Sequence, residues 1–268
     1  MKSDVTFILP VRNGEPYLTE CLASVVGQSY QDWRLLILDN CSSDRTRELC
    51  DAYKGDPRVV YLRNETDIGA PANFLKGLRM CDTRYFALVS HDDKYISPNA
   101  VLDARMILEQ NQNVAAVYSH MQWIDEKSRK IFTLKFSPVG LVSSDEVARR
   151  SILKCRNLFG VPLLARTEHI AGYTPDPKLY YTGDIEYSLI MGRNREIFVM
   201  DDCCYAIRFH KSNNTMRNYK HTRRELAYMA AKHGIHLSLR DRILMRFNNL
   251  WMMAQKFCFF LYLDYLRR

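Results

Sequence analysis

The sequence predicts an α/β fold with a mostly parallel sheet flanked by helices and a C-terminal helical extension. Short apolar runs typical of buried strands alternate with stretches of helical periodicity over residues 5–90. Polar residues follow these runs where the strands would end. From residue 213 onward the only regular pattern is helical. Because strands that alternate with helices are joined by right-handed crossovers, we expect the strands to lie parallel.

Composition indicates an ordinary globular protein. The 268 residues, 47% hydrophobic and 25% charged, can form one large domain or a domain with an appendage. The 8 cysteines include no CxxC pair, which argues against a zinc site or a disulfide framework and favours a reducing cytosol. The first residues, Met1 to Asp4, lead into a strand-like run too short for a signal peptide, so we expect a cytoplasmic protein.

The first part of the chain contains the clearest strand and helix patterns. Strands are expected at 5–9, 33–38, 59–62 and 85–89, and helices around 18–26, 46–53 and 69–80. Pro10 should end the first strand, because proline cannot continue a central ladder. Beyond residue 93 we expect a helix over 97–110, a strand at 114–118, and a hairpin formed by 121–125 and 130–136.

Polar residues at the strand ends should gather along one edge of the sheet, where open α/β sheets bind their ligands. They are Arg12, Asn13, Asp39, Asn40, Asp92 and Asp93. The sequence has neither a GxGxxG nor a GxxxxGK[ST] loop, so a metal ion is the natural partner for nucleotide phosphates. Asp92 and Asp93 directly follow a buried strand, and Mg²⁺ is usually held by one or two carboxylates plus substrate phosphates. The alternative is that Asp92, Asp93 and Lys94 form a solvated turn.

Four blocks resemble the inverting family 2 glycosyltransferases with the GT-A fold, in that family's order. They are ILPVRNGE (8–15), LDNCSSDRT (38–46), RNETDIG (63–69) and SHDD (90–93). The resemblance covers about residues 4–210. It implies a nucleotide-diphospho-sugar transferase with a Rossmann-like sheet at 1–212. The residues of the tail itself predict a basic amphipathic helical extension at 213–268.

The resemblance also implies roles for individual residues. Those implied to bind the nucleotide sugar are Pro10, Arg12, Asn13, Glu15, Asp39, Gly69, Asn73, His91 and Asp92. Asp39 would bind the base, and Asp93 and His210 would bind Mn²⁺ or Mg²⁺. His91 stands where many relatives have an acid, which leaves the ribose contact open. Gly69 could instead be only a helix-start turn, and Asn73 only an exposed helical position; Arg208 and Lys211 are further candidates for phosphate contacts.

The block YTGDIEYSL (181–189) resembles the family's acidic motif at a helix start, where one acid is the catalytic base. Asp184 is favoured, with Glu186 as the alternative; Asp184 could also serve only as a helix cap. A sugar hydroxyl attacks well only when its proton is removed, so a carboxylate must lie within hydrogen-bond reach of it. Attack opposite the leaving nucleotide inverts the anomeric centre, and a metal ion can neutralise the departing diphosphate.

The tail is basic: residues 208–268 contain 13 lysines and arginines against 3 aspartates and glutamates, in a chain of net charge +8. Helices are expected at 222–232 and 241–266. The second is interrupted by polar and charged residues, so it does not resemble a spanning segment. It could lie in a membrane interface, which would make the protein peripheral on the cytoplasmic face. The alternatives are that it packs on the catalytic domain or on a second subunit in a homodimer.

The expected activity is hexosyl or N-acetylhexosaminyl transfer from a nucleotide-diphosphate sugar, by default a UDP-sugar, to a glycan or lipid-linked acceptor in surface polysaccharide synthesis. One alternative is a nucleotidyltransferase, although the glycine-rich basic loop of that class is missing after the first strand. Another is a non-catalytic protein that binds nucleotide sugars or anionic surfaces. No nucleic-acid partner is expected, because no RNA-binding motif occurs.

Overall fold

The computed structural model describes residues 3–210 and 219–266, with side chains over 3–210 and 221–252. Four parallel strands form one half of its sheet, in the order β3-β2-β1-β4. They are β1 (Val5–Val11), β2 (Trp33–Asp39), β3 (Val59–Arg63) and β4 (Tyr85–Leu88). Each lies within two residues of its predicted range, which confirms these strands. The prediction that Pro10 ends the first strand is wrong, because β1 continues through Pro10 to Val11, which stands opposite Asp39 of β2.

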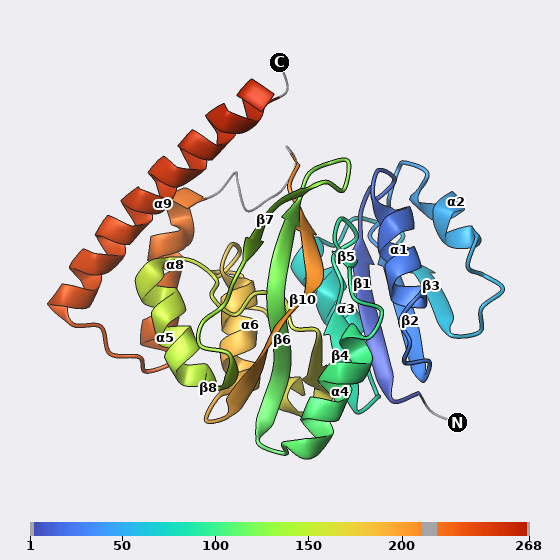
Figure 1. Ribbon diagram of the computed structural model, residues 1–268, viewed down its shortest axis with the longest axis horizontal. Helices are drawn as coiled ribbons and strands as arrows, with labels where there is room; N and C mark the ends of the chain where they lie inside the picture. The colour runs from blue at the N-terminus through green and yellow to red at the C-terminus, as the bar shows by residue number, and fades with distance from the viewer. Residues whose placement is uncertain (1–2, 211–218, 267–268) are drawn as a thin grey trace.

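Helices cover both faces of this half of the sheet (Figure 1). They are α1 (Leu18–Val26), α2 (Thr46–Asp51) and α3 (Ala70–Met80). The apolar side of α1 packs with Phe7 and Leu9 on one face, and α3 packs with Ile8 and Leu38 on the other. A Cβ at Gly77 of α3 would lie 2.4 Å from Ile8 Cγ2, so glycine allows this helix to approach the strands closely.

The second half of the sheet is mixed. The short strand β9 (Leu164–Arg166) runs antiparallel to both β4 and β6 and so joins the two halves. Beyond it, β6 (Val114–Ile124) and β10 (Glu196–Arg208) are parallel. Three antiparallel strands complete the sheet: β5 (Lys94–Tyr95) and β8 (Gly140–Ser143) on β10, and β7 (Lys130–Leu134) on β6.

The predicted hairpin is present as β6 and β7, but the two strands predicted at 114–118 and 121–125 are one continuous strand. The polar pair Ser119 and His120 does not interrupt it, because both side chains are buried with partners. Ser119 Oγ donates to the His120 carbonyl at 2.8 Å and accepts from the Cys204 NH at 3.2 Å. Buried polar residues with hydrogen-bond partners are compatible with a strand interior.

The remaining helices are α4 (Ala100–Gln110), α5 (Ser144–Lys154), α6 (Gly183–Gly192), α8 (Tyr219–Lys232) and α9 (Leu239–Leu266), with a 3₁₀ turn at Thr167–Ile170. Both predicted C-terminal helices are therefore confirmed. In Figure 1, α9 runs diagonally along the outside of the molecule beside α5 and α8.

The first half of α9 packs on α5, as one of the alternatives for this helix predicts. Asn248 Nδ2 donates to the Leu153 carbonyl at 2.9 Å, Cys155 Sγ donates to the Met245 carbonyl, and Arg149 pairs with Asp241 at 3.0 Å. The other side of α9 exposes large apolar side chains, namely Leu239, Ile243, Leu244, Phe247, Leu250 and Trp251. Among the residues that the structure describes, no helix is both long and apolar enough to cross a bilayer.

Candidate active site

The loops that follow β1 and β2 are bonded to each other at the edge of the sheet. The Asn13 NH donates to Ser42 Oγ at 3.0 Å, and the Gly14 NH donates to Thr46 Oγ1 at 2.9 Å. The Glu15 NH donates to an Asp44 carboxylate oxygen at 2.9 Å. These bonds fix the loop that contains Arg12, Asn13 and Glu15, while Pro10 lies half-buried in β1 beneath it.

Asp39, at the end of β2, is fully buried beside this loop. One carboxylate oxygen accepts from the Ser42 NH at 2.8 Å and the other from the Tyr61 hydroxyl at 2.5 Å. Burial, followed by the hydrogen bond to Asp39, raises the pKa of Tyr61. Sequence reasoning missed Tyr61, because its role depends on β3 lying beside β2.

Gly69 and Asn73 occupy different environments at the start of α3. Gly69 has φ 81° at the helix N-cap, which favours glycine, and its NH donates to Asp67, the ion-pair partner of Arg12. Asn73 is buried, so the alternative that it is an exposed helical position is wrong. Its side-chain amide donates to the Leu38 carbonyl at 2.7 Å and accepts from Asn64 at 2.9 Å. These bonds hold the start of α3 against the end of β2 and the residue that follows β3.

Asp92 and Asp93 follow β4 in a largely buried turn, so the solvated-turn alternative is also wrong. Asp93 is 6% exposed and accepts a hydrogen bond from the Arg208 NH at 2.9 Å. Asp92 accepts one from His210 Nε2 at 2.8 Å. The end of β10, with the two residues that follow it, and the turn after β4 therefore bring Asp92, Asp93 and His210 together.

The two adjacent carboxyl groups have opposite pKa shifts. Burial, together with the charge of Asp92, raises the pKa of Asp93 well above its ordinary value. Burial also opposes the ionisation of Asp92, but the hydrogen bond from His210 and the nearby His91 hold its pKa below the ordinary value. The pKa of His91 is itself lowered by burial. Such a carboxylate pair favours a bound cation.

The donor set fits a hard divalent ion that is shared with a substrate. Among residues 3–210 and the described part of the tail, no three His, Cys, Asp or Glu side chains form a metal site by themselves. Asp93 and Asp92 can supply carboxylate oxygens, and diphosphate oxygens would have to complete the coordination. Since His210 Nε2 already contacts Asp92, this nitrogen would have to exchange that contact to bind the ion directly.

Arg208 supports this site from the protein interior. Its guanidinium is fully buried, lies 4.6 Å over the Tyr17 ring, and donates to the Asp92 carbonyl, Ser128 Oγ and Glu20. Arg208 is therefore engaged in protein contacts that hold the end of β10 against the Asp92 turn. Lys211, the other predicted phosphate contact, lies outside the described residues.

The two candidate bases on α6 lie in very different environments. Asp184 is exposed in the first turn, where its carboxylate accepts from Asn157 Nδ2 at 2.7 Å and from the Ile185 NH at 2.9 Å. Although the residue is exposed, neighbouring protein atoms partly desolvate its carboxylate and raise the pKa of Asp184, and the hydrogen bond from Asn157 opposes this shift. Glu186 is fully buried and pairs with Lys232 at 2.7 Å and His233 at 2.9 Å.

A residue distant in sequence holds the start of α6. Thr182 is the N-cap, so Asp184 is not at the cap position. Glu225 of α8 accepts from the Tyr181 NH at 2.9 Å and from both the NH and the hydroxyl of Thr182 at 3.0 Å. Sequence reasoning missed Glu225, because only the packing of α8 on α6 reveals this contact.

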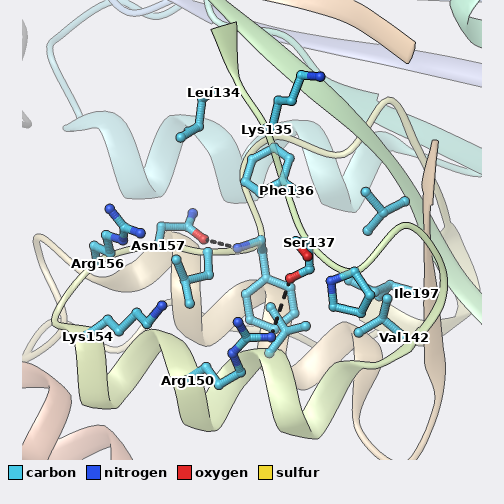
Figure 2. Close-up of a pocket in the computed structure, with 15 residues that line it drawn as sticks. Leu134, Lys135, Phe136, Ser137, Val142, Arg150, Lys154, Arg156, Asn157 and Ile197 are labelled. Atoms are coloured by element: carbon cyan, nitrogen blue, oxygen red, sulfur yellow. Dashed lines mark hydrogen bonds between the residues drawn. The ribbon is translucent and has the colours of Figure 1, made fainter. Parts of the chain in front are cut away.

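Helix α6 lies next to the strand that leads to Asp92 and Asp93. Tyr187 of α6 packs edge-on against Phe86 of β4 and Phe74 of α3, with ring centroids 6.2 and 5.5 Å apart. The Asp92–Asp93 turn and Asp184 therefore belong to neighbouring elements, although they hydrogen-bond to separate partners. Asn157, the hydrogen-bond partner of Asp184, also lines a hollow of about 200 Å³ (Figure 2).

Known proteins with similar sequences include bacterial and archaeal glycosyltransferases. The chain is 30% identical over 124 residues to the UDP-Glc:alpha-D-GlcNAc-diphosphoundecaprenol beta-1,3-glucosyltransferase WfgD of Escherichia coli, covering 46% of this chain and 48% of that protein. It is 35% identical over 92 residues to the putative teichuronic acid biosynthesis glycosyltransferase TuaG of Bacillus subtilis, covering 34% of this chain and 36% of that protein. The matches thus span less than half the length of these relatives.

Solved structures show the same fold. Staphylococcus aureus TarS in complex with UDP-GlcNAc superposes with a TM-score of 0.68 at 18% identity, covering 84% of this chain and 66% of that one. The mannosyltransferase PcManGT from Pyrobaculum calidifontis, in complex with GDP-Man and Mn²⁺, gives 0.63 at 15% identity, covering 96% and 74%. The predicted GT-A fold is confirmed. Residues 6–175 match the model of "Glycosyl transferase family 2", and the chain therefore belongs to this family.

Proposed function

We propose that this protein is a metal-assisted, inverting glycosyltransferase that moves a sugar from a nucleotide-diphosphate sugar to a hydroxyl of a glycan or lipid-linked acceptor. The observation that carries the proposal is the buried Asp92–Asp93 pair at the carboxyl end of β4, beside a helix that presents Asp184 to solvent. A nucleotidyltransferase or a non-catalytic binding protein does not need the second, exposed acid.

The donor would lie along the edge of the sheet. Arg12, Asn13 and Glu15 stand in the loop above buried Asp39, where a nucleotide base and ribose could bind. UDP is the proposed nucleotide, because TarS binds UDP-GlcNAc and WfgD uses UDP-Glc. The transferred sugar is then proposed to be a hexose or an N-acetylhexosamine.

Asp93, with Asp92, would hold Mn²⁺ or Mg²⁺ against the diphosphate, and PcManGT was solved with Mn²⁺. When bound, the ion supplies charge neutralisation for the leaving nucleoside diphosphate. His210 donates to Asp92 and keeps that carboxylate oriented.

Asp184 is the proposed general base, and Glu186 is the less suitable candidate. An acceptor hydroxyl would give its proton to the Asp184 carboxylate as its oxygen bonds to the anomeric carbon and the bond from that carbon to the diphosphate oxygen breaks. The raised pKa makes Asp184 a stronger base than an ordinary aspartate. Glu186 is fully buried, with an ion pair to Lys232 and a hydrogen bond to His233, so an acceptor could not reach it.

A donor panel tests the proposal. We expect the protein to release a nucleoside diphosphate from at least one sugar donor, with Mn²⁺ or Mg²⁺ required and chelation abolishing release. The matching donor should also raise the melting temperature, because a ligand that binds only the folded state stabilises it. Release of inorganic diphosphate from a nucleoside triphosphate and a sugar phosphate would instead favour a nucleotidyltransferase.

A further inference from the structure

Two adjoining hollows share three cations on α5 and in the loop that follows it. The first, of about 200 Å³, lies between α5 and the segment that joins β7 to β8 (Figure 2). The second, of about 550 Å³, lies between α5 and α9. Arg150, Lys154 and Arg156 line both. In Figure 2, Arg150 and Lys154 reach toward the first hollow, and Arg156 lies at its edge.

The charge of these cations is not neutralised within the described part of the chain. None of the three forms an ion pair there, and Arg150 has only a long hydrogen bond, 3.4 Å, to the Ser137 carbonyl. The neighbouring Arg149 shows the contrast, since it pairs with Asp241 at 3.0 Å. Three unpaired cations around a concave surface concentrate positive potential and favour a multiply charged oxyanion such as phosphate or diphosphate.

The second hollow adds an apolar wall. Leu244, Trp251 and Met252 of α9 line it together with Leu153. Leu244 and Trp251 are 45% and 58% exposed, and the exposed apolar side of α9 continues from them. An anion without a hydrocarbon would gain nothing from this wall, whereas an apolar chain attached to a phosphate would be partly removed from water.

The first hollow leads to the proposed base. Asn157 lines it and donates to the Asp184 carboxylate at 2.7 Å. Asn157 therefore connects the base to the first hollow, and the three cations that line both hollows connect the first to the apolar wall. An acceptor with a terminal sugar, a phosphate linkage and a hydrocarbon chain has its groups in the same order.

We propose that Arg150, Lys154 and Arg156 bind the diphosphate of an amphiphilic acceptor whose hydrocarbon chain lies along Leu244 and Trp251 and whose sugar points toward Asp184. Only the orientation of the acceptor sugar toward Asp184 rests on the proposed function. The binding of an alkyl diphosphate to the two hollows does not depend on catalysis.

Binding of decyl diphosphate below its micelle concentration tests the inference. We expect saturable binding by calorimetry with a change in Trp251 fluorescence, and at least about tenfold weaker binding in Lys154→Gln and in Arg150→Gln, since each removes a charge-assisted contact. Arg79→Gln on α3, equal in charge change and remote from the hollows, should bind as the wild type does. Decyl maltoside and inorganic diphosphate should each bind at least about tenfold more weakly.

Equal binding of inorganic and decyl diphosphate would overturn the lipid part, and equal binding by wild type and both variants would overturn the site. Transfer assays separate this inference from the proposed function. With a sugar attached to decyl diphosphate as acceptor, the variants should lose transfer but keep the donor-induced rise in melting temperature. If transfer to a decyl glycoside without phosphate is equally efficient, the acceptor inference fails while the proposed activity stands.

Discussion

The environment of single carboxyl groups distinguishes the residues available for chemistry from those that hold the fold. Asp184 and Glu186 are two positions apart, yet one is exposed and the other is buried against Lys232 and His233. The sequence leaves both open as the base, because their spacing does not show which side of α6 faces the protein. That distinction arises only when α8 brings Lys232 and His233 against Glu186.

Asn157 should set the pH dependence of the reaction. Its hydrogen bond stabilises the ionised form of Asp184, so Asn157→Ala should raise the pKa of Asp184 further. Because the base is active only when deprotonated, the acidic limb of kcat/KM should move to higher pH, by about half a unit to one unit. Asn157→Asp should move it further through like-charge repulsion. The remote variant Asn113→Ala is the control and should leave the pH profile unchanged. If the acidic limb of kcat/KM is also unchanged in both Asn157 variants, Asp184 is not the base.

At the scale of elements, the strands and helices of the first 90 residues were predictable. Very short strands were not, and neither α5 nor β10 was predicted, although both are of ordinary length. Periodicity identified β1 to β4 and the helices between them because each has enough residues to show a pattern. The strands β5, with 2 residues, and β9, with 3, do not. Their pairing depends on neighbours far along the chain, and β9 joins the two halves of the sheet.

The link between α8 and the start of α6 should contribute to stability. Glu225→Ala would leave the Tyr181 and Thr182 NH groups and the Thr182 hydroxyl without their acceptor, and should lower the free energy of unfolding by about 2–4 kcal/mol. Glu225→Gln keeps an acceptor oxygen and should cost about 1 kcal/mol. Urea unfolding measures both. A loss below about half a kcal/mol in Glu225→Ala would show that this contact does not hold the helix start.

Across the whole molecule, charge and apolar surface are unevenly distributed. The resemblance of four sequence blocks to a known family indicated the family and the fold. The basic tail indicated that this part of the chain could bind an anionic membrane surface. The sequence could not show that α9 uses one side to pack on α5 and leaves the other exposed, because its apolar residues occur on both sides.

We propose that the exposed side of α9 binds the surface of anionic membranes. The protein should sediment with vesicles that contain acidic lipids, and less so as salt rises, because basic residues contribute about 1 kcal/mol each near such a surface. The double variant Ile243→Asn, Phe247→Asn should lose most of this binding, since both side chains are over 60% exposed. Met106→Asn on α4 is the control. If the wild type instead forms dimers without vesicles and the double variant is monomeric, this surface would bind a second subunit.

The central claim is that the Asp92–Asp93 turn serves the donor and Asp184 serves the acceptor. Donor affinity and turnover should be measured together in three variants, with the metal ion present. Asp184→Asn should bind the donor as the wild type does but lose at least about a thousandfold in turnover. Asp93→Asn should lose metal-dependent donor affinity. Asp202→Asn, a control at an exposed position, should change neither quantity. Full turnover in Asp184→Asn, or unchanged metal-dependent donor binding in Asp93→Asn, would contradict the account.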